Sequence, residues 1–241
     1  MKRILCIGDV ILDILPAPFP ISKQKILEDG ETFVNSVIFQ RGGCGGNFVC
    51  VLKSIYPDAE VNFVSRIAND SNSEFLIEEM KKYGVTQKFV KDSTVKCQIT
   101  IAISFKDGER HFITHLGGLA NFCIEDITDE MFEGVDHLAY RGIWFAEKLL
   151  LKAEQFLQKA KSKHIPISMD LGFDPFWNEE KKTEEINHRV KLRKQATLNS
   201  LKYIKYLFGN EKEFLNLTDQ KHINDAKIGR AHVWTPVTEY D

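Results

Sequence analysis

Short apolar runs that alternate with helical stretches constrain the fold of this chain most strongly. The stretches 71–83 and 146–163 have helical character, and the second is amphipathic, with one apolar face. Runs that end in Gly, Asp or Asn are typical of buried strands that stop at a functional edge. This alternation predicts an α/β fold, a parallel sheet with helices on both faces. The apolar runs are Ile4–Ile7, Val61–Val64, His137–Tyr140, Ile165–Met169 and Tyr203–Phe208.

Two segments break this rhythm and predict a small antiparallel sheet. Strict alternation over 99–115 surrounds Asp107-Gly108, which favours a hairpin with a two-residue type I′ turn. That turn would pair Phe105 with Arg110 and Ile103 with Phe112. The β-prone stretch 32–40 lies just before a glycine cluster. We therefore expect a β lid inserted into the α/β body, with lid segments near 14–40 and 97–115.

Composition excludes several classes of protein. The net charge is -2, from 32 basic and 34 acidic residues, so no polyanion such as nucleic acid is expected as a partner. The mixed charges of 179–194 predict a solvated helix face. No run approaches a membrane span, and Asp9 and Asp13 interrupt the apolar N-terminal stretch, which argues against a signal peptide. The five cysteines are odd in number and lack a Cys-x-x-Cys pair, which favours a reducing, cytoplasmic location.

The glycine cluster at 41–47 is the strongest candidate binding element. It reads Arg-Gly-Gly-Cys-Gly-Gly-Asn and precedes a helical run over 48–56. Glycines allow the backbone to approach a ligand, and the first N–H groups of the helix are expected to be unpaired and to face outward. Asn47 offers one donor and one acceptor, which suits a sugar hydroxyl. The alternative is a tight strand-to-helix turn; the spacing does not fit a dinucleotide fingerprint.

Two carboxylates follow the first predicted strand. Asp9 and Asp13 would lie near its carboxyl end, where a carboxylate can accept hydrogen bonds from two neighbouring hydroxyls. Either residue alone also fits an ordinary loop or capping role. Their combination with the glycine cluster favours a polyol site.

Five motifs in order make the chain resemble the ribokinase-like (PfkB) family of carbohydrate kinases. They cover most of residues 1 to 220. They are Gly8 to Asp13, Gly42-Gly43-x-Gly-Gly-Asn47, Asn69-Asp70-Ser71, Gly117-Gly118-Leu119-Ala120-Asn121 and Asn210-Glu211-Lys212-Glu213.

The resemblance implies a site and its cofactors. Asp13 and Asn47 would hold sugar hydroxyls, Gly42 and Gly43 would let the backbone close on the ring, and the lid would exclude water during transfer. Asn210 and Glu213 match the family's Asn-x-x-Glu element, which organises ATP phosphates and Mg²⁺, with Glu213 at the metal. The alternative for this pair is an exposed helix start capped by Asn210.

The chain departs from the family pattern in two places. Gly172 and Asp174 stand where many members carry Asn and Arg, so the loop 170–177 would accept a different polar group. The family's catalytic Gly-Ala-Gly-Asp run, with its general base, has no counterpart in this sequence. We therefore expect residues 1–227 to be a truncated kinase domain, incomplete at the C-terminus and inactive as given. Residues 228–241 would be a non-native tail, with a natural divergent tail as the alternative.

The expected activity of the intact protein is ATP-dependent phosphorylation of a hydroxyl of a small sugar or sugar derivative. A nucleoside kinase is the near alternative, with a base pocket in the loop 170–177. A non-catalytic sugar-binding or regulatory protein is the alternative from another class. By analogy with the family, a homodimer through the lid is also possible.

Overall fold

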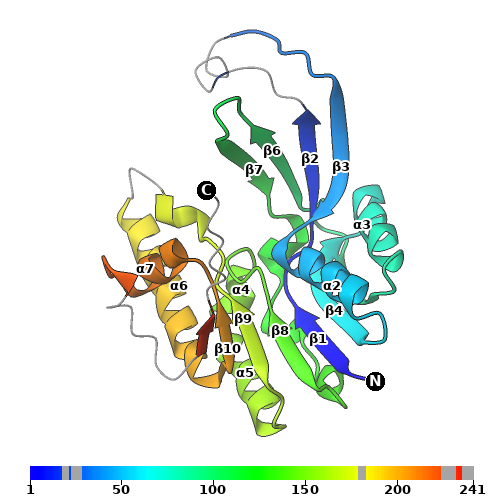
Figure 1. Cartoon of the computed structure of the whole chain (residues 1–241), viewed down its shortest axis with the longest axis vertical. Coiled ribbons are helices and arrows are strands. Elements are labelled where there is room, and N and C mark those ends of the chain that lie inside the picture. The colour runs from blue at the N-terminus through cyan, green and yellow to red at the C-terminus, as the bar shows by residue number, and fades with distance from the viewer. Residues whose placement is uncertain (18–21, 23–28, 179–182, 224–231, 235–241) are drawn as a thin grey trace.

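The structure is a computed structural model that describes residues 1–17, 22, 29–178, 183–223 and 232–234. Its main element is a seven-stranded sheet of order β11-β10-β9-β8-β1-β4-β5, in which every pairing is parallel. Figure 1 shows this sheet in the body of the molecule, with a second, smaller sheet projecting from it. The strands are β1 (Arg3–Ile7), β4 (Glu60–Ala68), β5 (Thr86–Asp92), β8 (His137–Tyr140), β9 (Ile167–Asp170), β10 (Tyr206–Phe208) and β11 (His232–Trp234).

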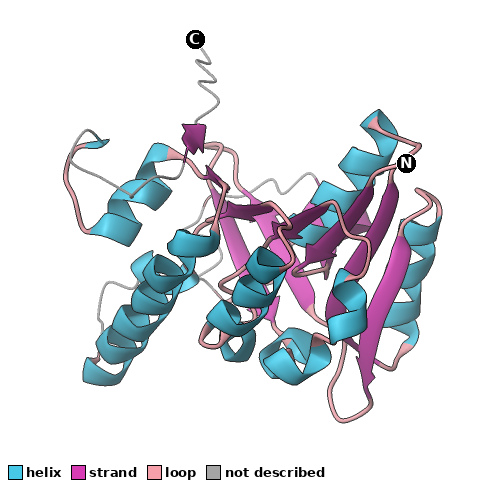
Figure 2. Ribbon diagram, turned by 90° about the horizontal axis from the view of Figure 1, so that it is seen from below, coloured by secondary structure: helices cyan, strands magenta, loops and turns pink. Residues whose placement is uncertain are grey.

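Helices cover both faces of the main sheet, as Figure 2 shows from below. Alternate residues of β1 face opposite sides, so Leu5 and Ile7 enter one apolar core whereas Cys6 enters the other. The helices α2 (Cys44–Ile55) and α3 (Ser71–Lys81) pack in the core that contains Cys6. The core with Leu5 is closed by α4 (Glu147–Leu150), α5 (Ala153–Ser162), α6 (Glu184–Ser200) and α7 (Glu211–Thr218). The predicted α/β fold is confirmed.

Short 3-10 helices complete the chain, and two helix boundaries differ from the expectation. The stretch expected as one helix over 146–163 is interrupted at Leu151 and Lys152, between α4 and α5. Helix α2 begins at Cys44 rather than Phe48, because Asp9 satisfies its first N–H groups. The 3-10 helices are η1 (Gly117–Asn121), η2 (Ile124–Asp126), η3 (Asp129–Phe132), η4 (Pro175–Asn178) and η5 (Leu201–Tyr203).

The smaller sheet is the lid sheet, of order β3-β2-β6-β7. Its strands are β2 (Ile11–Ala17), β3 (Ser36–Gly42), β6 (Ile99–Ser104) and β7 (Arg110–His115). The pairs β2–β3 and β6–β7 are antiparallel, as expected, and a short parallel ladder between β2 and β6 joins them. The lid sheet stands above the carboxyl ends of the main strands (Figure 1).

The register of the β6–β7 hairpin was predicted wrongly by one residue. Ile103 pairs with His111 rather than with Phe112, and Ser104 pairs with Arg110. The cause is a three-residue loop: Phe105 N donates to Glu109 O at 2.8 Å, and Gly108 has a φ of 84°. A type I turn followed by a left-handed glycine gives such a loop, which adds one residue to the expected turn.

The end of the chain lies partly outside the described residues. Strand β11 extends the main sheet through its backbone, with His232, Val233 and Trp234 in register with Tyr206, Leu207 and Phe208. The other residues of the expected tail, 228–231 and 235–241, are outside the described part, so the boundary at 227 stays a prediction.

The described residues include no helix with the length and apolar character needed to cross a membrane. All five cysteines are free thiols.

Candidate functional site

The predicted site residues lie around the carboxyl edge of the main sheet, where β1 leads into the lid sheet. Asp9 is 1% exposed, and its side chain lies at the start of α2. Its Oδ1 accepts from Gly45 N at 2.8 Å, its Oδ2 accepts from Cys44 N at 3.1 Å, and its carbonyl oxygen accepts from Gly46 N at 2.9 Å. The expectation that these N–H groups are unpaired and face outward was therefore wrong. Asp9 caps α2 from a distant part of the chain, which is a structural role.

Glycines are required at this edge because carboxylates occupy the space of their missing side chains. A Cβ at Gly42 would lie 2.0 Å from Oδ2 of Asp13, and one at Gly142 would lie 2.0 Å from Oδ1 of Asp9. Gly43, with a φ of 83°, packs against the backbone of Asp9 and Val10. The cluster thus seats two carboxylates as well as starting a helix.

Asp13 is the more accessible of the two carboxylates. It lies on β2 opposite Gln40 and is half-buried against Gly42. Burial, together with the charge of Asp9, raises the pKa of Asp13 to about 6, while Arg41 acts in the opposite direction. Asp13 is partly desolvated and has no direct ion pair among the described residues. Hydrogen-bond donors from a ligand would therefore stabilise its charged form.

Asn47 is exposed on the first turn of α2 and is held by Arg41. Its Oδ1 accepts from Arg41 Nη1 at 2.6 Å. Arg41 pairs with Leu12 in the β2–β3 ladder, whereas Asp13 pairs with Gln40, so Arg41 and Asp13 belong to opposite faces of the pleat. Asn47 and Asp13 thus flank the same glycine turn without contacting each other. The Nδ2 group of Asn47 donates to no described residue, so Asn47 can donate to a ligand while its Oδ1 keeps the hydrogen bond from Arg41.

The loop 170–177 does not present Asp174 to a ligand, contrary to the sequence expectation. Asp174 is fully buried and forms a two-point ion pair with Arg193, at 2.9 Å to Nε and 3.1 Å to Nη2. Trp144 and Trp177 are also buried and stack edge to face at 5.1 Å, so they form core rather than an open base pocket. Of the aromatic residues of this loop, Phe173 is exposed.

Asn210 and Glu213 form a reciprocal cap at the start of α7. Glu213 N donates to Asn210 Oδ1 at 3.0 Å, and Glu213 Oε2 accepts from Asn210 N at 2.9 Å. Glu213 Oε1 also accepts from Asn210 Nδ2 at 2.8 Å. This is a capping box, so the pair has the structural role that was the alternative at the sequence level.

A role for Glu213 at a metal is compatible with this cap. Burial, and then the charge of Asp170, raises the pKa of Glu213. The described residues contain no group of three or more acidic, His or Cys side chains that could hold a metal alone. Mg²⁺ needs only one or two carboxylates together with substrate phosphates, and a cation would relieve the repulsion between Asp170 and Glu213. These two residues therefore fit Mg²⁺.

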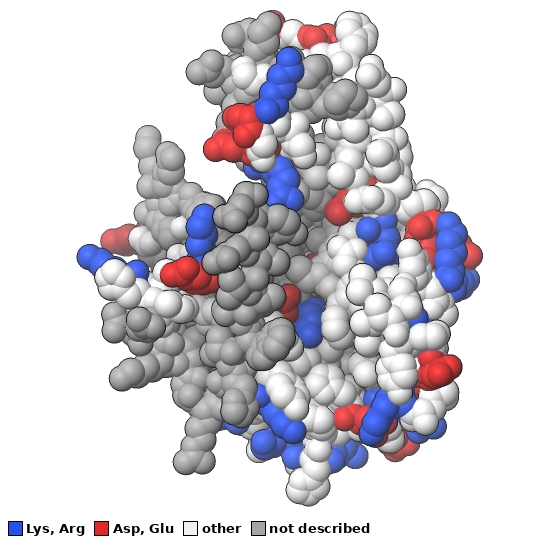
Figure 3. Space-filling view, viewed as in Figure 1, with Lys and Arg blue, Asp and Glu red and all other residues white. Residues whose placement is uncertain are grey.

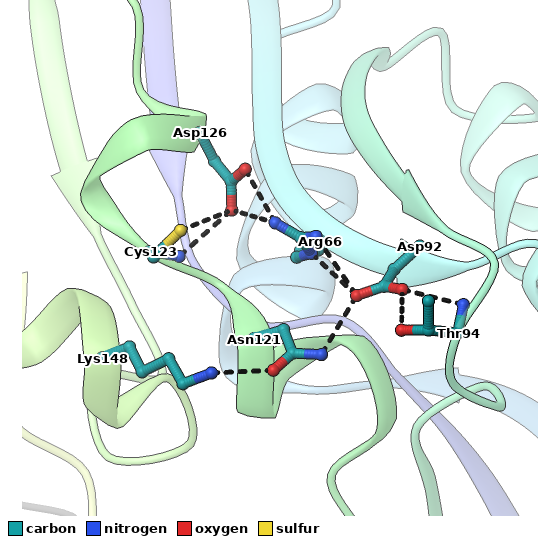
Figure 4. Close-up of polar contacts among 7 residues, drawn as sticks. All are labelled: Arg66, Asp92, Thr94, Asn121, Cys123, Asp126 and Lys148. Carbon is teal, nitrogen blue, oxygen red and sulfur yellow. Dashed lines mark hydrogen bonds and ion pairs between the residues drawn. The ribbon is translucent and has the colours of Figure 1, made fainter.

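A polar network centred on Arg66 anchors the lid hairpin to the body (Figure 4). The guanidinium of Arg66 contacts Asp92 at 3.2 Å and Asp126 at 3.0 Å. Asp92 also accepts from Asn121 Nδ2 at 3.1 Å, which fixes η1, the segment that follows β7. At the other root of the hairpin, Gln98 Nε2 donates to the carbonyl oxygen of Arg66 at 3.2 Å. Sequence reasoning missed this network, because its members are far apart along the chain.

Charged side chains on the surface follow no single sign. On the face drawn in Figure 3, Lys and Arg alternate with Asp and Glu over the described residues. This distribution agrees with the near-neutral net charge.

Comparison with known proteins first defines a class. The chain resembles the PfkB protein from Polaromonas sp. JS666 with a TM-score of 0.74 and 15% identity, over 94% of this chain and 71% of that chain. For ribokinase from Thermotoga maritima the TM-score is 0.65 with 20% identity, over 94% and 67%. For fructokinase with bound ATP from Xylella fastidiosa it is 0.69 with 18% identity, over 90% and 64%. At these identities the likeness establishes a ribokinase-like α/β fold.

The family follows from a second comparison. Residues 1–233 match the pfkB family of carbohydrate kinases, and the chain belongs to this family. The resemblance inferred from the five motifs is thereby confirmed.

Proposed function

We propose that the intact protein transfers a phosphoryl group from ATP to a hydroxyl of a small sugar or sugar derivative. Membership of the pfkB family supports phosphorylation of a carbohydrate in general. The observation that carries the proposal for this chain is the half-buried Asp13 carboxylate, seated against Gly42 beside the start of α2. No described residue donates a hydrogen bond to the Asp13 side chain, so it has acceptor capacity for neighbouring sugar hydroxyls, and Gly42 provides the space in which this carboxylate lies.

The remaining residues have supporting roles in this proposal. Asn47 would supply a second polar contact through its Nδ2 group, and the lid sheet would exclude water from the site. Asp170 and Glu213 would hold Mg²⁺, which neutralises charge on the transferring phosphates when it is bound. The general base is assigned to none of these residues. Its location in a segment that this sequence lacks, and the inactivity of the chain as given, stay predictions.

A homodimer through the lid is part of the proposal. The lid sheet carries large apolar side chains at the surface, among them Phe39 at 55% exposed and Ile113 at 53% exposed. Apolar side chains on the outer strands of a small sheet favour burial against a second copy. The cytoplasmic location also stays a prediction.

The test combines binding and turnover. Isothermal calorimetry on the 241-residue chain should detect one or more sugars from a panel of pentoses and hexoses. Asp13→Asn should weaken that binding by about 10-fold to about 100-fold, because it removes charge-assisted hydrogen bonds. The matched control Asp129→Asn changes an exposed carboxylate far from Gly42 and should leave binding unchanged.

Turnover separates the proposed kinase from the alternatives. Sugar-dependent ADP release by the intact protein supports a kinase, whereas sugar binding without ADP release by that protein supports a regulatory or sugar-binding protein. ADP release with nucleosides and none with sugars would support a nucleoside kinase. Absence of any sugar binding and of sugar-dependent ADP release would refute the proposal.

A further inference from the structure

Arg141 is a buried cation with only neutral hydrogen-bond partners. The residue is 6% exposed and follows β8 directly. Its Nη1 donates to the carbonyl oxygen of Tyr140 at 3.2 Å, and its Nη2 donates to Ser168 Oγ at 3.3 Å. The guanidinium also stacks near the rings of Phe48 and Phe208, at 4.5 and 5.5 Å from their centroids. Its Nε has no acceptor among the described residues.

Arg193, the other arginine that is buried among the described residues, is paired with carboxylates. Arg193 contacts both Asp174 and Glu147, at 2.9 and 2.6 Å. Arg66, as described above, contacts two carboxylates as well. Within the described residues, Arg141 has no carboxylate at ion-pair distance. A buried charge is normally paired, because removing it from water is costly.

The groups around Arg141 compensate its positive charge only in part. Burial lowers the pKa of Arg141, and this effect exceeds the opposing influence of Cys6 and Asp170. Asp170 is the carboxylate that acts on Arg141 through space, yet it makes no ion pair with it in the described residues. The positive charge of Arg141 is therefore only partly compensated by the groups around it.

Arg141 belongs to the same edge of the sheet as the proposed sugar site. The next residue, Gly142, lies against the carboxylate of Asp9, and a Cβ at Gly8 would lie 2.5 Å from the carbonyl oxygen of Arg141. The start of α2, a common place for an anion, is taken because Asp9 accepts its N–H groups. Arg141 is thus a side-chain cation that this part of the edge offers to an anion.

We propose that Arg141 binds an oxyanion of the ligand, either the carboxylate of a sugar acid or a phosphoryl group. The inference rests on the proposed function, since it names the chemistry of the ligand at the same site. Ser168 orients the guanidinium: it accepts from Arg141 and can therefore direct its own hydrogen to Nε2 of His137, 2.8 Å away. The Nε–H and the second hydrogens of the terminal nitrogens are left for the oxyanion, in the planar arrangement that suits a carboxylate or phosphate.

The experiment compares ligands that differ by a carboxylate in place of a hydroxymethyl group, using calorimetry on the 241-residue chain at low salt. D-gluconate is compared with sorbitol, and D-glucuronate is compared with D-glucose. Inorganic phosphate is titrated alone. The acidic member of at least one pair should bind at least about 10-fold more tightly than its neutral partner if the oxyanion is a substrate carboxylate. Binding of phosphate without such a preference would assign the oxyanion to a phosphoryl group.

Variants assign the effect to Arg141. Arg141→Gln should remove the preference for the anion, because it weakens binding of the acidic member more than binding of the neutral one. Arg141→Lys keeps the charge but loses the planar donors, so it should retain part of the preference for the anion. This variant replaces Arg141→Gln in the experiment if the glutamine variant does not fold. Arg189→Gln is the matched control, since Arg189 is exposed and pairs with Glu147 at 2.6 Å.

The outcomes separate this inference from the proposed function. Equal affinities for acidic and neutral sugars, with no phosphate binding, overturn the oxyanion site and leave sugar binding intact. Phosphate binding that depends on Arg141, without binding of any sugar, supports the oxyanion site while the sugar kinase proposal fails. If no anion binds, or if Arg141→Gln retains the full preference for the anion, the inference is wrong.

Discussion

Replacing Asp174 by asparagine tests the role that the structure gives to the loop 170–177. Asp174 is fully buried and its two oxygens accept from Nε and Nη2 of Arg193, whose side chain is 2% exposed. The substitution keeps the shape of the side chain but leaves the guanidinium buried without its main counter-charge. Its effect should therefore be on stability, with sugar affinity unchanged.

The magnitude follows from the partners that remain. Removing one partner of a buried ion pair typically costs about 3–5 kcal/mol. Arg193 keeps Glu147, which is itself 26% exposed, and the backbone oxygen of Trp144, both at 2.6 Å. We therefore expect a loss of about 2–4 kcal/mol in the free energy of unfolding. For a chain of this size that is a decrease of roughly 5–15 °C in Tm.

Urea unfolding followed by circular dichroism measures this loss, and calorimetry with the sugar found in the panel measures binding. Asp219→Asn is the matched control, because Asp219 pairs with Lys194 at the surface and is 77% exposed. A change below about 0.5 kcal/mol is expected there. If Asp174→Asn leaves stability unchanged and weakens sugar binding, Asp174 faces the ligand and the structural reasoning is refuted.

Three further predictions concern pH and assembly. Burial raises the pKa of Asp13 to about 6, so its carboxylate is protonated below that pH. Sugar affinity should therefore fall as the pH drops through 6. Asp13→Asn should flatten this pH profile of sugar affinity, and a steep profile in the variant would contradict the assignment. Burial lowers the pKa of His137 from 6.5 to about 4, so the native state favours the neutral ring, and stability should be lost as pH falls from about 6.5 towards 4. The difference between the urea midpoints at pH 4.5 and pH 7.5 should be smaller in His137→Gln than in the unmodified protein. If the difference is the same in both proteins, this histidine is not its cause. Phe39→Asp should shift a lid dimer to monomer in sedimentation velocity, whereas Leu192→Asp on α6 should not, and equal behaviour of the two would count against the lid interface.

The parallel sheet could be predicted because its signals are local. Each apolar run and the helix after it are contiguous in sequence, and β1 is apolar from Ile4 to Ile7, as expected for a strand that is buried on both faces. The glycine turn at 42–43 was also predictable, because few other residues allow such close backbone contact. Family membership followed from the order of these local motifs.

Side-chain partners across long sequence distances could not be predicted in the same way. Nothing near Asp174 in sequence indicates Arg193, which lies on α6. Asp9 looked like a ligand-binding carboxylate, yet the helix it caps begins 35 residues later. Arg141 belongs to none of the five motifs, and only the structure shows that it is buried without a carboxylate at ion-pair distance among the described residues. The hairpin register depended on one extra loop residue, which the Asp-Gly signal does not specify.

The two halves of the lid sheet are fastened to the body in different ways. The β6–β7 half is tied at both roots around Arg66, whereas the β2–β3 half continues directly into the glycine turn at 42–43. Within the part of the chain that the structure describes, β2 and β6 join these halves through the register Leu12–Ile99, Asp13–Thr100 and Ile14–Ile101. A closing motion that keeps the Arg66 tether intact must therefore slide or unzip this short seam. The strand that moves is the one bearing Asp13, so opening the seam would carry with it the carboxylate that is proposed to bind the sugar.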